Sequence, residues 1–460
     1  MNKEKSISPG QLSSSPELPR VLGIFSIIGI VIGMMIGSGI FINPPKVAKD
    51  VGTPELMLLV WVVGGILSFF GALSLSELGA AFPQAGGIYI YLQEAYGSLI
   101  AFLFGWTLFL VIDSGSVATL AVAFSTKYLP FFITLSPWES KIVSILLIAA
   151  LATINYLGVK RGAFLMNFLT TIKFVALLGV SAIIFIFAKG SASNFLSSSS
   201  SSVAQPASGS VLAGFGVALV AALWAYKGWE SASFSAGEVK NPEKRLPLGI
   251  FIGSALVIIL YLLANMAYLY VFPTGQMVDE SSSIYNRVAA EAMKVAIGPV
   301  GASIIAFIIL FSITGAANGH LLTGPRVYYA MAKDGLFFKQ IAKVHPKFLT
   351  PHISIIALAV WSSLLCLTGT FEQLFTYVVF GLWIFMGLTV AGVIILRKKR
   401  QDIQRPYKTW GYPVTPVLFV LSALYLSINS LINTFWNSFA GLAIIFVGIP
   451  VYFYWKTKKK

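Results

Sequence analysis

The stretch VLGIFSIIGIVIGMMIGSGIF, residues 21–41, decides the fold class of this 460-residue chain. It carries no charged residue. A run of roughly 20 apolar residues is long enough to cross a lipid bilayer as a helix, whereas a transmembrane barrel would show alternating strands of about ten residues. The stretch therefore predicts a membrane-spanning helix.

Similar apolar runs follow along the whole chain, in which 57% of residues are hydrophobic and only 11% are charged. A soluble domain carries about 25% charged residues. We predict spans near residues 21–44, 55–82, 95–125, 139–158, 164–188 and 211–238, and again near 246–272, 296–332, 353–368, 372–396, 412–434 and 437–455. The expected fold class is an all-α integral membrane protein of about 12 transmembrane helices.

The net charge of +15 raises the question of nucleic-acid binding. An even number of spans places both termini on one side, and most Lys and Arg residues then fall in segments on that side. This is the bias of cytoplasmic loops, so the charge requires no nucleic acid. We expect a multi-pass protein of the cell membrane, the plasma or bacterial inner membrane. Residues 1–20 would form a disordered cytoplasmic tail, and 456–460 a basic cytoplasmic end.

Catalytic chemistry has little support in the sequence. A membrane-embedded enzyme needs clustered nucleophiles, bases or metal ligands, but the chain has three scattered histidines and a single cysteine, Cys366, in an apolar run. We therefore predict no enzyme activity, no metal and no cofactor.

Two predicted spans contain residues that weaken a helix at mid-membrane. The first holds Gly37-Ser38-Gly39, closed by Pro44 and Pro45, and the sixth holds residues 224–229, WAYKGW. Non-helical backbone is tolerated in the membrane only where it lines a cavity or is buried in protein. Corresponding breaks in two halves of a chain indicate an inverted repeat with a substrate site at the midplane.

A broken helix offers unpaired N–H groups to an anion and unpaired carbonyls to an ammonium group. A zwitterion carries both kinds of charge. An amino acid therefore suits such a site even without charged side chains nearby.

A series of short motifs follows in order along the chain: Ile36–Phe41, Ser76–Gly79, Gly86–Tyr89, Glu94–Gly97, Trp224–Tyr226, Gly228–Trp229, Gly237–Glu238 and Asn318–Gly319. Together these motifs resemble those of the amino acid–polyamine–organocation superfamily. The order of the set is most similar to the L-type amino acid transporter branch, which includes the bacterial serine/threonine exchanger. The resemblance implies a LeuT-type fold with discontinuous helices 1 and 6. Its inverted five-helix repeats would be residues 21–188 and 211–396, and residues 412–455 would form two additional helices.

The resemblance also implies a substrate site at the two breaks. The substrate carboxylate would meet the amides around Ser38 and Gly39, its ammonium would meet carbonyls near Ile36 and Trp224, and the Trp224 ring would act as a gate. The implied substrate-binding residues are Ile36, Gly37, Ser38, Gly39, Trp224, Ala225, Tyr226, Lys227 and Gly228.

Lys173 lies in the fifth predicted span. In the L-type branch the corresponding lysine places its ammonium where sodium-coupled relatives bind Na⁺, and the resemblance gives Lys173 this role, with Ser312 as a hydrogen-bond partner. The alternative is a lysine that extends to the membrane edge.

Three charged residues depart from the family pattern: Lys227, Glu230 and Asp113. We consider Asp113 and Glu230 as possible specificity residues. Asp113 could pair with Lys227, sense the substrate side chain, or face water at the outer end of its span. His320 is expected to be an interior, hydrogen-bonded histidine, although it could titrate near neutral pH.

The function that follows is sodium-independent transport, with exchange of small or neutral amino acids by alternating access. A proton-coupled amino acid or polyamine symporter and a non-transporting amino acid sensor are the alternatives.

Animal L-type transporters join a heavy chain through an external cysteine, and residues 127–138 have none. We expect no disulfide-linked heavy chain, and the sequence leaves the oligomeric state open.

Overall fold

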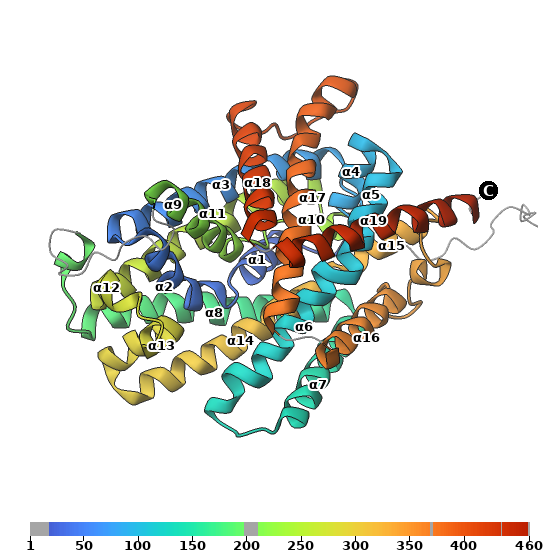
Figure 1. The fold of residues 1–460 in the computed structure, drawn as a ribbon. Coiled ribbons are helices and arrows are strands. Elements are labelled where there is room, and N and C mark those ends of the chain that lie inside the picture. Colours follow the sequence, from blue (N-terminus) through green and yellow to red (C-terminus); the bar gives the residue numbers. More distant parts are fainter. Residues whose placement is uncertain (1–17, 197–209, 369–370, 434, 459–460) are drawn as a thin grey trace, which may run out of the picture.

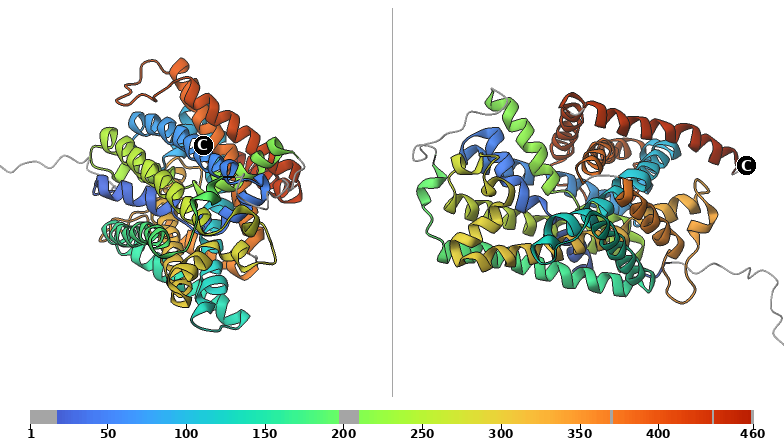
Figure 2. Two further views of the ribbon diagram at one scale, coloured as in Figure 1. Left: turned by 90° about the vertical axis from the view of Figure 1, so that its left-hand side faces the viewer. Right: turned by 60° about the horizontal axis from the view of Figure 1, so that its bottom comes forward.

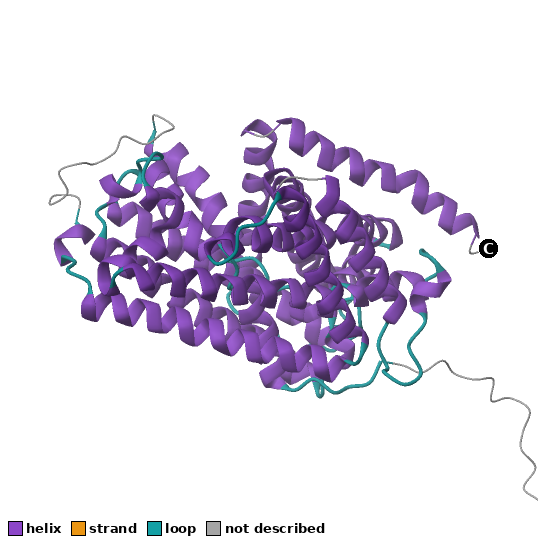
Figure 3. Cartoon of the chain, turned by 90° about the horizontal axis from the view of Figure 1, so that it is seen from below, coloured by secondary structure: helices purple, strands orange, loops and turns teal. Residues whose placement is uncertain are grey.

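The computed structural model describes residues 18–196, 210–368, 371–433 and 435–458. This part of the chain consists of helices and loops (Figure 3), and its β-pairing is limited to one isolated parallel bridge between Leu22 and Val239. Residues 1–17 and 459–460 lie outside the described residues. The disordered tail expected at residues 1–20 and the basic cytoplasmic end expected at 456–460 therefore stay predictions.

The first half begins with a broken span. Its helices are α1 (Ile24–Met35) and α2 (Gly39–Val51), followed by α3 (Pro54–Ala81), α4 (Ile88–Tyr96), α5 (Ser98–Thr107), α6 (Asp113–Ala123), α7 (Pro137–Tyr156) and α8 (Val159–Phe187). The π-helical segment η1 (Leu108–Ile112) joins α5 to α6. A second π-helical segment, η2 (Phe124–Tyr128), follows α6 and leads into the 3₁₀ turn η3 (Leu129–Phe131), so that Ser98–Phe131 forms one long span. A further 3₁₀ turn, η4 (Ala192–Phe195), follows α8.

The second half repeats the broken-helix theme. Its elements are α9 (Val211–Ala225), α10 (Ser231–Phe234), η6 (Ala236–Glu238), α11 (Pro242–Val271), α12 (Thr274–Met277), α13 (Ser283–Ile297), α14 (Pro299–Thr323), α15 (Pro325–Lys333), η7 (Lys339–Ala342), α16 (His352–Thr368), α17 (Phe371–Lys399), α18 (Val414–Asn433) and α19 (Phe435–Lys458).

The number of spans agrees with the sequence analysis. Within the described residues, nine helices are long and apolar enough to cross a membrane, and the bent pair of α1 and α2 makes a tenth. Two shorter apolar helices, Val211–Ala225 and His352–Leu367, lie at the sixth and ninth predicted spans. The all-α membrane fold class is confirmed.

Both expected breaks are present. The chain bends by 45° between α1 and α2, where Ile36 leaves helical geometry with ψ at 87°. Helix α9 ends at Ala225, and Gly228 adopts φ of +127° before α10 begins. One boundary was wrong, because Pro44 and Pro45 do not close the first span but lie inside α2, which continues to Val51.

The two breaks meet at the centre of the molecule (Figure 1). Helix α1 packs against α8, α11 and α14, while α2 packs along α9. Helices α18 and α19 pack on α3, α5 and α17, on the flank away from α8 (Figure 2). The interior between the broken helices is thereby enclosed by α6, α8 and α14.

The sequence analysis did not predict the helices between α11 and α14. Helix α12 and the amphipathic helix α13 occupy residues expected to form a loop, and α13 packs against α14 and α2. Its polar residues, among them Asn286, Arg287 and Lys294, interrupt any apolar run. A search for long apolar runs detects spanning helices and passes over helices of this amphipathic type.

We predict that Gly228→Ala lowers thermal stability. A methyl group there would lie 2.6 Å from the backbone carbon of Met34, and the positive φ disfavours any side chain. Gly179→Ala is the matched control, since a methyl group there meets nothing within 4 Å. Thermal unfolding in detergent should show a lower midpoint for Gly228→Ala alone. Equal midpoints for both variants and the parent would contradict the tight packing of the sixth-span break on α1.

Candidate functional site

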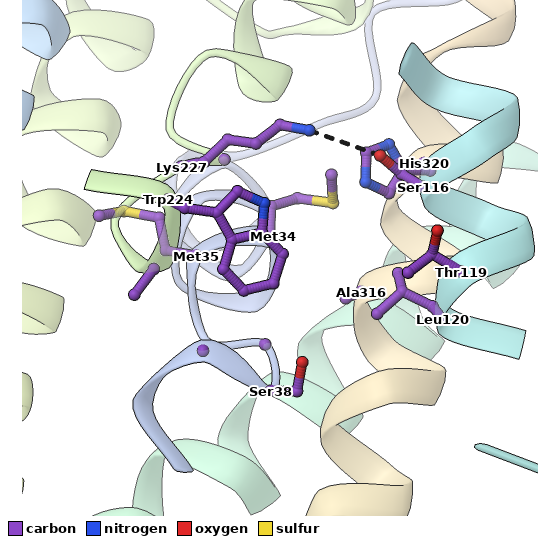
Figure 4. Close-up of a pocket in the computed structure, with 14 residues that line it drawn as sticks. Met34, Met35, Ser38, Ser116, Thr119, Leu120, Trp224, Lys227, Ala316 and His320 are labelled. Carbon is purple, nitrogen blue, oxygen red and sulfur yellow. Dashed lines mark hydrogen bonds between the residues drawn. The ribbon is translucent and has the colours of Figure 1, made fainter. Parts of the chain in front are cut away.

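A pocket opens between the two breaks and the inner faces of α6 and α14 (Figure 4). Its wall combines backbone, methionines, hydroxyls and two titratable side chains. The lining residues are Met34, Met35, Gly37, Ser38, Gly39, Ser116, Thr119, Leu120, Trp224, Ala225, Lys227, Gly228, Ala316 and His320.

The first break leaves backbone carbonyls that no helical amide satisfies, and Lys173 of α8 meets several of them. Its Nζ donates to the carbonyl oxygen of Gly33, to that of Ile36 at 2.8 Å and to that of Ser312 at 3.4 Å. The side chain is fully buried. Lys173 therefore points into the protein and does not extend to a membrane edge.

Ser312 of α14 also binds the backbone at the first break. Its hydroxyl donates to the carbonyl oxygen of Ile36 at 2.8 Å. The Ile36 carbonyl thus accepts from an ammonium and a hydroxyl at once. Sequence reasoning expected a hydrogen bond between the Lys173 and Ser312 side chains, whereas the structure has both side chains on a shared acceptor and Lys173 on the Ser312 carbonyl.

Tyr261 of α11 joins the two breaks. Its hydroxyl lies 2.7 Å from the carbonyl oxygen of Met35 and 3.2 Å from that of Ala225. These carbonyls belong to the last residues of α1 and α9. One fully buried side chain thereby links both helix ends at the pocket.

The start of α2 presents backbone amides to the pocket, in contrast to the carbonyls at the ends of α1 and α9. The first-turn amides of a helix have no intrahelical acceptor, and Ser38 and Gly39 bring this end of α2 to the pocket wall. Gly39 allows a close approach, because a methyl group there would lie 2.9 Å from the Ala225 Cβ and 3.0 Å from the Trp224 ring. The amides therefore lie directly beside the Trp224 indole.

Lys227 and Glu230 both come from the broken part of the sixth span but differ in placement. The Lys227 side chain projects into the pocket, with its Nζ 3.5 Å from the Ser116 hydroxyl (Figure 4). The Glu230 carboxylate is buried behind the wall and accepts from the Gly228 amide at 2.9 Å. Glu230 thus stabilises the shape of the unwound segment.

Asp113 has a different partner from the one proposed from the sequence. Its carboxylate pairs with His320 Nδ1 at 2.7 Å and accepts from the Tyr328 hydroxyl at 3.3 Å. It is 2% exposed, so it does not face water. His320 is the interior, hydrogen-bonded histidine expected from the sequence, and it also lines the pocket.

The structure separates the implied site residues into two groups. Seven line the pocket: Gly37, Ser38, Gly39, Trp224, Ala225, Lys227 and Gly228. Others stand behind the wall and support it: Ile36, Lys173, Tyr226, Glu230, Ser312 and Asp113. Sequence reasoning missed the contributions of α6 and α14, which are Ser116, Thr119, Leu120 and Ala316, and the role of Tyr261. No motif marks them, because their role depends on which helix faces meet.

Metal binding has no structural candidate within the described residues. No group of three or more His, Cys, Asp or Glu side chains there could hold a metal ion. The polar groups that line the pocket are backbone groups, hydroxyls, Lys227 and His320.

Replacing Tyr261 with Phe should lower the thermal midpoint measurably. The change removes the hydroxyl from both carbonyls; the Met35 carbonyl keeps the Gly37 amide at 2.9 Å, whereas the Ala225 carbonyl loses its described donor. An unsatisfied buried group costs about 1–3 kcal/mol. Tyr268→Phe is the matched control on the same helix, since its buried hydroxyl has no hydrogen-bond partner among the described residues. Calorimetry of the two purified variants compares them directly, and an equal shift for both would argue against the link between the breaks.

Known proteins resemble this chain over nearly its whole length. The family model described as amino acid permease matches residues 22–450. The chain is 32% identical to the human b(0,+)-type amino acid transporter 1, over 98% of this chain and 90% of that protein. It is 30% identical to the serine/threonine exchanger SteT of Bacillus subtilis, over 96% of this chain and 98% of that protein. It is also 32% identical to the human cystine/glutamate transporter, over 98% and 87% of the two chains.

These relatives are named as transporters and not as enzymes. The match covers both broken helices and every element that lines the pocket. The central pocket, the two broken helices and the full-length similarity lead to one conclusion: this chain is a membrane transporter of the amino acid permease family, within the amino acid–polyamine–organocation superfamily.

Proposed function

We propose that this protein is a sodium-independent exchanger of amino acids that works by alternating access. The observation that carries the proposal is the buried Lys173 ammonium against the carbonyl oxygens at the break of α1. Carbonyls freed by unwound helices are the groups that coordinate Na⁺ in transporters of this architecture. A fixed ammonium on the same oxygens supplies the positive charge without a mobile ion.

The main-chain groups of the substrate would bind at the backbone of the two breaks. Its carboxylate would accept from the amides at the start of α2, around Ser38 and Gly39, where the helix dipole favours negative charge. Its ammonium would donate to carbonyls at the ends of α1 and α9. The Trp224 ring, beside Gly39, would cover the bound substrate as a gate.

Alternating access would move the two broken helices together. Helix α11 packs on both α1 and α3, and α9 packs on α2 and α3. Such a mutually packed group can rock as a unit against α8 and α14 around a fixed site.

Membrane orientation and partners form part of the same proposal. Both chain ends would lie in the cytoplasm, as the distribution of Lys and Arg indicates. The single cysteine, Cys366, is buried in α16 with its thiol 3.8 Å from the Ala118 carbonyl. We therefore propose that no disulfide joins this chain to a partner subunit.

Proton-coupled transport is the second candidate. It is favoured by the Asp113–His320 pair, because His320 lines the pocket and paired carboxylate and imidazole groups inside a membrane commonly form proton relays in transporters. If this pair took up a proton when substrate binds, proton movement would be coupled to substrate transport. Exchange and proton symport differ in their need for substrate on the opposite side.

The test is uptake of radiolabelled amino acids into proteoliposomes with sodium or choline outside, and with empty or amino-acid-loaded lumens. We expect uptake that requires internal amino acid and is equal in both salts. Uptake into empty vesicles driven by a proton gradient would replace exchange with symport. A requirement for sodium would contradict the role of Lys173.

Replacing Lys173 with Met should reduce exchange by at least about tenfold, since it leaves the Gly33 and Ile36 carbonyls without their cation and weakens the break by more than one charge-assisted hydrogen bond. Lys160→Met is the matched control, because Lys160 begins the same helix but is exposed. Initial rates of counterflow compare both variants at equal protein content. Full activity of Lys173→Met would contradict the proposal.

A further inference from the structure

Lys227 is a cation in the pocket whose hydrogen-bonding capacity is largely unused. An ammonium has three donors, and the Lys227 Nζ makes one long contact, at 3.5 Å, with the Ser116 hydroxyl. Among the described residues, no carboxylate lies within ion-pair distance of it. The Lys227 side chain lines the pocket in which a substrate would bind (Figure 4).

The two carboxylates nearest in the fold are engaged elsewhere. Glu230 accepts from the Gly228 amide, and Asp113 accepts from His320 and Tyr328. Both attract Lys227 electrostatically, but neither accepts its hydrogen bonds. An incoming acceptor would therefore find the Lys227 donors available.

A second cavity shares three walls with the pocket. It is bordered by Ile42 of α2, Lys127 of η2 and Ile309 of α14, whereas the pocket is bordered by Gly39, Leu120 and Ala316 in the same three spans. Seven residues separate the positions on the third and eighth spans, a rise of about 10 Å. The second cavity therefore lies about two helical turns from the pocket along these spans, and α13 forms another part of its wall. We refer to this cavity as the vestibule.

The vestibule wall is positively charged. Its lining includes Lys46, Lys127 and Arg287 and contains no Asp or Glu among the described residues. The nearby Glu280 is paired with Lys49. A cavity lined by one sign of charge raises the local concentration of opposite charges and their rate of association.

We propose that the substrate is an amino acid with a carboxylate on its side chain, and that Lys227 binds this carboxylate. The inference rests on the proposed amino acid exchange and narrows its substrate class from the small or neutral amino acids expected from the sequence. Ser38 and Lys227 lie on opposite sides of the Trp224 ring (Figure 4). A substrate whose main-chain carboxylate sits at Ser38 would extend its side chain past Trp224 toward Lys227.

Substrates with other classes of side chain would bind less favourably next to Lys227. A neutral apolar side chain would displace water from Lys227 and leave a buried ammonium unpaired, which is costly. A cationic side chain or a polyamine would bring a second positive charge against Lys227 in a medium of low dielectric constant. A carboxylate provides a charge-assisted hydrogen bond and is also the class that the vestibule attracts.

The experiment is counterflow of radiolabelled L-glutamate and of its uncharged isostere L-glutamine in proteoliposomes. The parent protein should prefer glutamate by at least about tenfold, and L-lysine should not compete. Lys227→Met should lower the glutamate-to-glutamine ratio of initial rates by about tenfold or more. Lys339→Met is the control, because Lys339 is an exposed lysine of η7 that lines neither cavity. This variant should keep the glutamate-to-glutamine ratio of the parent protein.

The outcomes separate the inference from the function on which it rests. Exchange of glutamine equal to or faster than that of glutamate by the parent protein would overturn the assignment of Lys227 while leaving amino acid exchange intact. This comparison needs no variant, so poor folding of Lys227→Met cannot obscure it. Absence of exchange for every amino acid tested would overturn the proposed function itself.

A combined Lys46→Gln and Arg287→Gln variant should slow glutamate uptake and weaken its salt dependence. Unchanged glutamate rates would contradict the role of the vestibule.

Discussion

The carbonyl groups released by the break after α1 need hydrogen-bond donors inside the membrane, and the rest of the site depends on how the fold supplies them. Lys173 and Ser312 converge on the Ile36 carbonyl, and Tyr261 donates to Met35. Each donor comes from a different helix, α8, α14 or α11. The broken segment is therefore fixed by three surrounding helices, which satisfies the requirement that irregular backbone at membrane depth be buried or line a cavity.

In the proposed binding mode, backbone and side chains recognise different parts of the substrate. The helix ends would provide amides and carbonyls that match the two charges common to all amino acids, without any specific side chain. Side chains from α6, α14 and the sixth-span break form the remaining wall, where Ser116, His320 and Lys227 differ in chemistry from one another. General amino acid binding can thus persist while this wall sets the preference among side chains.

The sequence was sufficient for the features that local composition controls. Long apolar runs predicted the spans, and Gly37-Ser38-Gly39 and residues 224–229 marked both breaks, because few residue types tolerate unwound backbone. The placement of Asp113 against His320 and of Tyr261 between two helix ends could not be predicted, since it depends on contacts between residues 207 and 226 positions apart. Helix α13 was missed for another reason: its polar residues conceal an amphipathic helix from a search for apolar runs.

The central claim is that the two breaks form the amino acid site, and the most direct measurement is a cryo-EM structure of the protein in lipid nanodiscs with bound amino acid. The account predicts ligand density between α1, α9, α6 and α14, with the main-chain carboxylate on the amides at Ser38 and Gly39 and the main-chain ammonium on carbonyls at the ends of α1 and α9. Lys173 should remain on the Ile36 carbonyl. Ligand density away from both breaks, or a sodium ion in place of the Lys173 ammonium, would contradict it.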